Sequence, residues 1–180
     1  GDWNVSKVIN MSSMFAQKST FNIDIGDWDV SSVTNMAYMF YFTLNQFNAD
    51  IGRWNTSNVT NMESMFHFVR NFNEDIGNWN VSSVTNMKYM FKQAHFFNQD
   101  IGIWNVSKVN NFEGMFQYAM SFNKDIGDWD VSNATNMAFM FYNTNFFNQD
   151  LGRWNVGNVN DMSYMFANTT YLNIKVLKPN

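Results

Sequence analysis

The chain has 180 residues, a formal net charge of −4 and no cysteine. The absence of cysteine excludes disulfides and thiolate metal sites, and the mild charge without a basic stripe argues against a dedicated nucleic-acid surface. No apolar run of transmembrane length is present, so no membrane-spanning helix is expected. With 19 Phe, 7 Trp and 14 Met, the chain has enough apolar side chains for a packed core, so disorder is not expected.

One segment of about 25 residues is repeated along the chain. The copy at 77–101 reads GNWNVSSVTNMKYMFKQAHFFNQDI, and the copy at 26–51 carries one extra residue within Tyr41–Gln46. A fixed period of this length is typical of solenoids, in which units stack because none can bury its apolar side alone. We therefore expect one seven-repeat solenoid domain over residues 1–176, followed by a tail at 177–180. The copies begin at Gly1, Gly26, Gly52, Gly77, Gly102, Gly127 and Gly152.

The first half of each copy predicts a short strand. Trp and Val alternate with polar residues in Trp-Asn/Asp-Val-Ser, as at 28–31, so Trp and Val are expected to face inward. Trp should then stack on Trp, and Phe on Phe, at about 4.8 Å, which is the distance between paired strands. The tryptophans of this expected structural ladder are Trp3, Trp28, Trp54, Trp79, Trp104, Trp129 and Trp154.

The second half of each copy predicts a two-turn helix. The pair Thr85-Asn86 suits a helix N-cap, and the Met-x-x-Met-Phe segment that follows places apolar residues at the spacing of one helical face. Glu63 and Glu113 each lie three residues after a candidate cap, as in a partial capping box. The expected fold class is therefore an α/β solenoid with one short strand and one short helix in each of the seven repeats.

The repeated string FNxDIGxWNVSxVTNMxxMF resembles the repeat of the BspA-like surface-protein family, which is common in mycoplasma lipoproteins. The resemblance extends from Gly1 to Asn173, and the spacing Ile25-x-x-Trp28-x-Val30 is similar to the leucine-rich-repeat frame. The resemblance implies a leucine-rich-repeat-like solenoid on a secreted or surface-anchored protein, with a role in adhesion or host interaction. It supplies no catalytic residues to transfer.

Two outward columns vary from copy to copy, and we expect a binding face there because specific recognition needs variation. One column precedes each tryptophan and the other follows the serine of Trp-Asn/Asp-Val-Ser. The alternative is neutral drift on a solvated surface. The candidate binding residues are Arg53, Asn78, Ile103, Asp128 and Arg153 in the first column, and Asn58, Ser83, Lys108 and Asn133 in the second.

Other polar columns favour structural roles. The Asn/Asp and Ser columns of Trp-Asn/Asp-Val-Ser are nearly invariant, which favours stacked amides bonded from copy to copy. The aspartates near the end of each copy could capture backbone N–H groups or could bind calcium. Each copy offers one such aspartate, whereas calcium takes six to eight oxygens, so no metal site is expected. These aspartates are Asp24, Asp50, Asp75, Asp100, Asp125 and Asp150.

Catalysis and cofactors are not expected. His67 and His95 are solitary, and the chain has no Gly-rich phosphate loop and no acid pair at a unique position. The leading hypothesis is a non-enzymatic extracellular or cell-surface module, with its anchor outside this chain, that presents an extended face to a protein or glycan. The alternatives are a structural spacer that projects another domain and self-association through an uncapped solenoid end.

Overall fold

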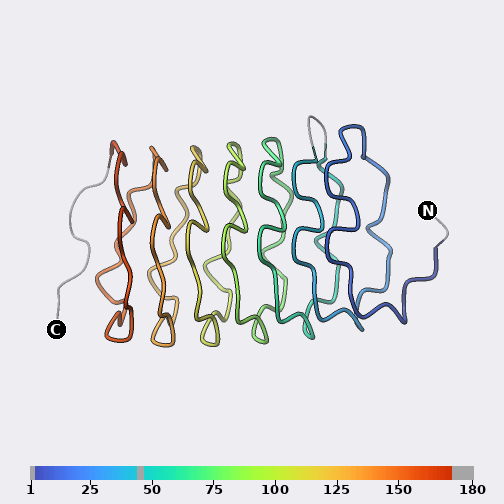
Figure 1. Cartoon of the computed structure of the whole chain (residues 1–180), viewed down its shortest axis with the longest axis horizontal. Coiled ribbons are helices and arrows are strands. Elements are labelled where there is room, and N and C mark those ends of the chain that lie inside the picture. The colour runs from blue at the N-terminus through green and yellow to red at the C-terminus, as the bar shows by residue number, and fades with distance from the viewer. Residues whose placement is uncertain (1–2, 44–46, 172–180) are drawn as a thin grey trace.

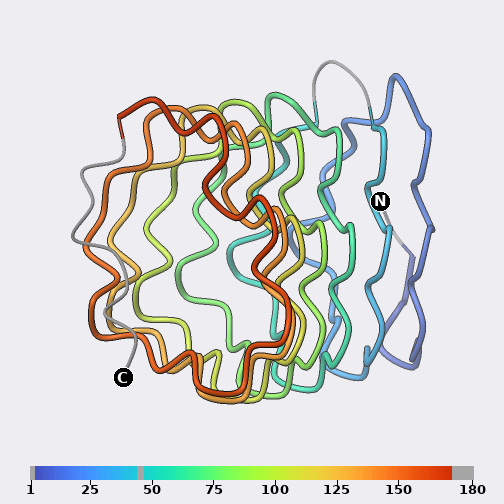
Figure 2. The ribbon, with the colours of Figure 1, turned by 60° about the vertical axis from the view of Figure 1, so that its left-hand side comes forward.

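The computed structural model describes residues 3–43 and 47–171. In it the repeats form coils that stack along one axis (Figure 1), and successive coils follow the same course around a shared interior (Figure 2). These two ranges contain no helix and no strand, and therefore no helix that could cross a membrane. The predicted domain end at residue 176 and the tail at 177–180 lie outside them. Parallel pairing is limited to single bridges that join Asn10, Asn35, Asn61, Asn86, Asn111, Asn136 and Asp161 in succession.

Tight turns build each coil. In the coil that starts at Ile76, backbone N–H groups donate to the carbonyl three residues earlier at 2.9–3.1 Å. Such a bond closes a β-turn, so the chain changes direction every few residues. The turns of this coil span 76–79, 81–84, 87–90, 89–92, 91–94 and 94–97.

The predicted helix of the Met-x-x-Met-Phe segment is wrong. In a helix, each N–H group would donate to the carbonyl four residues earlier. Instead, the N–H groups of Met87, Tyr89 and Phe91 donate to carbonyls of the next coil at 2.8–3.0 Å. Tyr89 and Gln93 have φ values of 56° and 57°, which place them in the left-handed region as the third residues of their turns.

The apolar spacing did not distinguish the two conformations. Residues at i, i+3, i+4 and i+7 line one face of a helix, and here Met87, Met90, Phe91 and Ala94 point into the core from consecutive turns, each fully buried. The predicted inward-facing residues are therefore confirmed, although their backbone conformation is not helical. A helix of two turns is unstable on its own, and hydrogen bonds to a neighbouring coil replace those that it would make.

The predicted strand of Trp-Asn/Asp-Val-Ser is also wrong. Trp79 and Val81 alternate inward as expected, but the turns at 76–79 and 81–84 confine them to a segment too short for a paired strand. The bridge to the neighbouring coils comes later, at Asn86. The α/β class and the leucine-rich-repeat architecture are therefore contradicted, and the chain is a solenoid built from turns.

Aromatic rings fill the interior. Phe91 stacks on Phe97 of its own coil with ring centroids 3.9 Å apart, and on Phe116 of the next coil at 5.8 Å. Trp54 and Trp79 stack at 6.3 Å with their planes 4° apart. These distances between ring centroids exceed the 4.8 Å that was expected for stacked side chains.

The interior tryptophans also bond from coil to coil. The indole Nε1 of Trp79 donates to the carbonyl of Ile51 in the preceding coil at 3.0 Å. Each such tryptophan therefore buries a large ring and satisfies its polar N–H group in the same contact. The same bond, at 3.0–3.2 Å, is made by Trp54, Trp104, Trp129 and Trp154.

We expect Trp79→Ala to destabilise the chain far more than Trp3→Ala. Trp79 is 3% exposed between two coils, whereas Trp3 is 67% exposed at the end of the stack. The expected loss is about 3–5 kcal/mol for Trp79 and about 1 kcal/mol or less for Trp3. Chemical denaturation of both variants measures the difference, and equal shifts in the midpoint would contradict the stacking contribution.

In five copies, the opening glycine is required by close backbone approach. A Cβ atom on Gly77 would lie 2.6 Å from the carbonyl oxygen of Asp100 in the next coil. The equivalent distances are 2.4–2.6 Å at Gly26, Gly52, Gly102 and Gly127. Because the opposing atom belongs to the backbone, an added methyl group would force neighbouring coils apart.

Gly77→Ala should therefore cost about 1–3 kcal/mol, the usual range for overpacking. Gly157→Ala is a matched control, because a Cβ atom there would meet only the side chain of Asn155 at 3.3 Å. We expect the control to change the free energy of unfolding by about 0.5 kcal/mol or less. Similar losses in both variants, measured by urea denaturation, would show that coil spacing does not impose the glycine.

Candidate functional site

The structure places the predicted binding residues at two rows of turn corners. In the first row, the residue before each tryptophan is the third residue of a turn, such as the turn at 76–79. In the second row, the residue after each serine is the third residue of a turn, such as the turn at 81–84. Ser83 is half-buried, and the others are exposed: Arg53, Asn78, Ile103, Asp128, Arg153, Asn58, Lys108 and Asn133. Exposure therefore leaves eight of the nine residues accessible to a partner.

Both arginines of the first row are held by neighbours. Arg53 pairs with Asp27 at 3.2 Å, and Arg153 pairs with Asp128 at 2.5 Å. Arg53 also borders a hollow of about 290 Å³ that Asp50 helps to line. These ion pairs are exposed, so each contributes little to stability, but each occupies the charge that a ligand would use.

The second row contributes to coil stacking. The side-chain amide of Asn58 donates to the carbonyl of Ser31 at 2.8 Å, and that of Asn133 donates to the carbonyl of Ser107 at 2.7 Å. Both carbonyls belong to the preceding coil. This row therefore already has a structural use at two of its four predicted positions.

The repeated aspartates capture backbone N–H groups, as one of the two sequence interpretations expects. Asp75 Oδ1 accepts from the N–H of Gly77 at 2.9 Å, and the other five aspartates do the same at 2.8–3.2 Å. Within residues 3–43 and 47–171, no three His, Asp or Glu side chains form a group that could hold a metal ion. The carboxylates therefore serve as turn caps.

Among the described residues, the Asn/Asp side chains of Trp-Asn/Asp-Val-Ser bond within their own coil, whereas bonds from coil to coil were expected. Asn80 Oδ1 accepts from the N–H and the hydroxyl of Ser82, within its own coil, at 3.1 and 2.7 Å. An amide ladder exists elsewhere, at the asparagine near the end of each copy. There Asn73 Oδ1 accepts from the N–H of Asn98, and Asn98 Oδ1 accepts from that of Asn123, at 2.9 and 3.0 Å.

A second surface lies on the outer side of the Met-x-x-Met-Phe segments. The apolar residues of these segments point inward, so the variable residues between and after them project outward at the left-handed turns. Many are aromatic and half-buried, and we call this surface the aromatic face. Sequence reasoning missed it because only the apolar positions of these segments were interpreted, and the aromatic residues between and after them were not considered as a group. Its residues are Tyr38, Tyr41, Phe42, Phe68, Tyr89, Tyr118, Phe139, Tyr142 and the exposed Tyr164.

The rings of the aromatic face contact one another across coils. Phe42 and Phe68 meet edge to face with centroids 4.9 Å apart, and Tyr118 meets Tyr142 in the same way at 5.5 Å. Phe139 stacks on Tyr164 at 5.1 Å. Such contacts hold large side chains in defined orientations at a surface.

Tyr89 is the centre of a polar network on this face. Its ring covers Gly114, where a Cβ atom would lie 2.4 Å from the ring. Its hydroxyl donates to Glu113, which also pairs with Lys88 at 2.8 Å, and the ammonium groups of Lys88 and Lys92 lie 4.9 and 4.5 Å from the ring centroid. Partial burial and the nearby Glu113 raise the pKa of Tyr89, so the phenol stays protonated at neutral pH.

Acidic residues anchor the network in two places. Tyr38 donates to Glu63 at 2.5 Å, and this bond raises the pKa of the Tyr38 phenol. At Glu113, partial burial favours the protonated acid, but hydrogen bonds from Lys88 and Tyr89 outweigh it and lower the pKa of the carboxyl group. Both glutamates therefore act as acceptors that orient tyrosines, and neither caps a helix.

His67 is buried beneath the aromatic face. Its ring packs edge to face on Tyr41 at 5.1 Å and stacks on Phe68 at 4.7 Å. Its Nε2 atom is buried and has no hydrogen-bond partner among the described residues. Burial, reinforced by the positive charge of Lys92, lowers the pKa of His67 to about 4, so the imidazole is neutral in the folded chain at pH 7.

We expect His67 to make the chain sensitive to mild acid. Unfolded histidine protonates below its ordinary pKa of about 6.5, whereas folded His67 protonates only near pH 4, so stability falls as pH decreases between these values. The expected loss from pH 7 to pH 5 is about 2 kcal/mol. His67→Gln should abolish most of this loss, whereas His95→Gln, at a half-buried histidine, should abolish less. Denaturation curves at both pH values measure it, and an unchanged loss in His67→Gln would contradict the assignment.

The stack of repeated coils defines a solenoid repeat protein. Residues 1–95 and 68–178 match the protein family described as "Mycoplasma protein of unknown function, DUF285". The two matches together cover nearly the whole chain, so the chain belongs to this family. No curated protein and no solved structure matches it.

Proposed function

We propose that this chain is a non-enzymatic binding module whose aromatic face takes a polypeptide partner. Its place would be on a secreted or surface-anchored protein, as in the BspA-like surface proteins that its repeat resembles. The structural support is the number of half-buried tyrosines on one surface. Tyrosine offers a large, rigid contact area and a hydroxyl group, and it is enriched in protein interfaces.

The observation that carries the proposal is variation along one row of positions that the coils hold in order. The core positions of the coils repeat, whereas the third residue of the first turn in each Met-x-x-Met-Phe segment does not. In that row the side chain changes in size, polarity and hydrogen-bonding capacity from coil to coil. A row of this kind can distinguish one partner from another, which a uniform ladder cannot do. Its residues, in order, are Ser13, Tyr38, Ser64, Tyr89, Gly114, Phe139 and Tyr164; Ser64 and Gly114 are buried, so the aromatic members are the ones that a partner would contact.

The charged groups of the aromatic face favour a polypeptide over a purely apolar ligand. Lys88 and Glu113 retain only 29% and 18% exposure of their side chains, so their ion pair is partly removed from water. Charged groups held in place at an interface contribute to specificity more than to raw affinity. An extended peptide could place its own charges and backbone groups against this network while its apolar side chains contact the rings.

The second candidate function is a structural spacer. It is favoured by the uniform core, in which the same Phe pair stacks at 3.9–4.1 Å in each of the first six coils. A spacer requires only this regularity and does not need the aromatic face. A binding experiment with variants of that face therefore separates the two functions.

We expect Tyr118→Ser with Tyr142→Ser to weaken binding of peptides selected from a displayed random library on the unmodified chain. Loss of two contacting rings should reduce affinity about tenfold or more, because aromatic residues often dominate binding energy. The measurement is a titration of each selected peptide against both proteins.

The matched control is the triple variant Arg53→Ser, Ile103→Ser and Arg153→Ser, which alters exposed corners of the first predicted row. Its affinity for the same peptides should stay within about twofold of the unmodified chain. If the control loses affinity and the tyrosine variant does not, the binding face lies at the first predicted row and not at the aromatic face. Failure to select any peptide, with binding to a glycan array instead, would contradict a polypeptide partner.

A further inference from the structure

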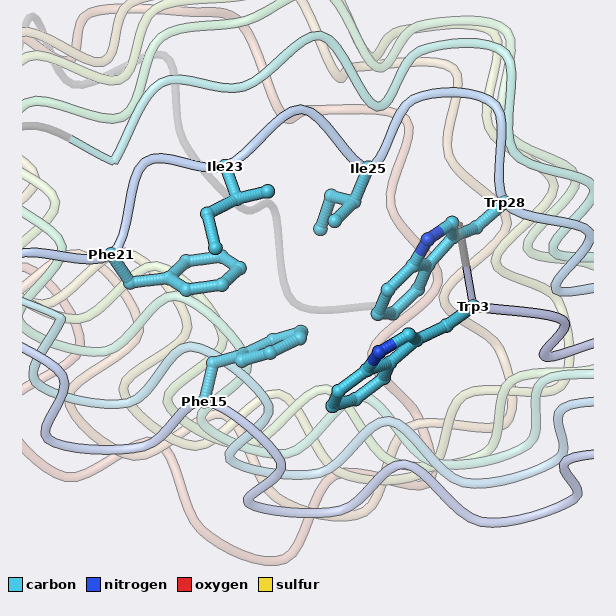
Figure 3. Close-up of a pocket in the computed structure, with 6 residues that line it drawn as sticks. All are labelled: Trp3, Phe15, Phe21, Ile23, Ile25 and Trp28. Atoms are coloured by element: carbon cyan, nitrogen blue, oxygen red, sulfur yellow. The ribbon is translucent and has the colours of Figure 1, made fainter. Parts of the chain in front are cut away.

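The N-terminal end of the stack exposes the interior of a coil. A hollow of about 160 Å³ opens there, and six apolar side chains line it (Figure 3). Trp3 is 67% exposed and Ile23 is 56% exposed. The remaining lining residues are Phe15, Phe21, Ile25 and Trp28. In the interior coils, the residues equivalent to Trp3 and Phe15 are almost completely buried. The N-terminal end therefore exposes a surface that, inside the stack, would be covered by another coil.

The same end presents a row of backbone acceptors. Between the first two coils, N–H groups such as that of Met11 donate to carbonyls such as that of Asn35. The corresponding carbonyls of the first coil are therefore directed toward the open end. Among the described residues, none donates a hydrogen bond to them. These four carbonyls belong to Asn10, Ser12, Met14 and Ala16.

The C-terminal end presents the complementary row of donors. Met137, Phe139, Phe141 and Asn143 donate their N–H groups to the last coil at 2.8–3.0 Å. One coil later, the equivalent N–H groups are directed away from the stack and have no acceptor among the described residues. They belong to Met162, Tyr164, Phe166 and Asn168, which have the same two-residue spacing as the acceptors at the other end.

We propose that copies of this chain associate head to tail, with the C-terminal coil of one copy seated on the N-terminal coil of the next. In this register the N–H of Met162 meets the carbonyl of Asn10, and Phe166 stacks on Phe15 of the second copy. The contact repeats the one that joins Phe141 to Phe166 within the chain, where the centroids are 5.5 Å apart.

The polarity of the backbone rows selects this arrangement over a symmetric dimer. Two N-terminal ends would oppose acceptors to acceptors, and two C-terminal ends would oppose donors to donors. Only unlike ends satisfy both rows and cover the apolar hollow together. A contact between unlike ends does not close on itself, so it produces open-ended chains of molecules. It uses the ends of the stack, and Tyr164 is the residue that it shares with the aromatic face.

Sedimentation velocity on the 180-residue chain tests the proposal. The mean mass should rise beyond that of a dimer over about a hundredfold increase in concentration, because open-ended association follows mass action. Ile23→Lys places a charge on the N-terminal end and should remove this rise. Ile103→Lys is the matched control, since Ile103 is 79% exposed at a corner in the middle of the stack, and it should leave the rise unchanged.

A second variant blocks the other end. Phe166→Lys should also remove self-association. If this variant lowers the melting temperature, Tyr164→Lys is used instead, because the Tyr164 side chain is 63% exposed. A mixture of Ile23→Lys with either C-terminal variant should form a dimer and nothing larger, because each partner has one open end. A monomeric unmodified chain at every concentration would overturn the proposal. So would a mixture that stays monomeric, or equal loss in Ile103→Lys.

Discussion

The structure depends on contact between one coil and the next. No single coil can enclose its own Trp, Phe and Met side chains, because a loop of about 25 residues has no second layer to cover them. Stacking provides that layer on both sides. It brings Phe91 between Phe66 and Phe116, and it gives the indole N–H of Trp79 an acceptor at Ile51. The hydrogen bonds of the turns shape each coil, whereas the bonds and rings between coils stabilise it.

This dependence explains what the sequence could and could not predict. The period, the inward positions and the capture of N–H groups by Asp75 and its equivalents were correct, because they follow from spacing and side-chain chemistry. The helix and the strand were wrong. Met87, Met90 and Phe91 have helical spacing, but consecutive turns give the same inward positions. Nothing local in the sequence shows that the N–H of Tyr89 bonds to the next coil, since its acceptor on Glu113 is 24 residues away.

The candidate site was missed for a related reason. Tyr89 carried no expectation from the sequence, because it lies between the apolar positions of a predicted helix and belongs to no repeated column. The left-handed turn instead directs it across Gly114 and toward the carboxylate of Glu113, so residues of different copies form one surface. The rows predicted from variation alone proved exposed except at Ser83, but Arg53 and Asn58 are already engaged with Asp27 and Ser31. Variation located surface positions correctly and did not show which of them were structurally committed.

The hydrogen bonds between coils give one wall of the stack an electrical polarity. Elsewhere some bonds run the opposite way, such as that from the N–H of Thr85 to the carbonyl of Thr60. In a parallel sheet, N–H groups of neighbouring residues point in opposite directions, and their dipoles nearly cancel. Here the intervening N–H groups of the Met-x-x-Met-Phe segment close turns within the coil. Those that remain, such as Met87, Tyr89, Phe91 and Gln93, all point toward the C-terminal end. Aligned peptide dipoles add along the axis, as they do in a helix. In a helix the N–H groups point toward the N-terminus, which carries the partial positive charge. In this wall of the solenoid the N–H groups point toward the C-terminal end, so the partial positive charge lies there.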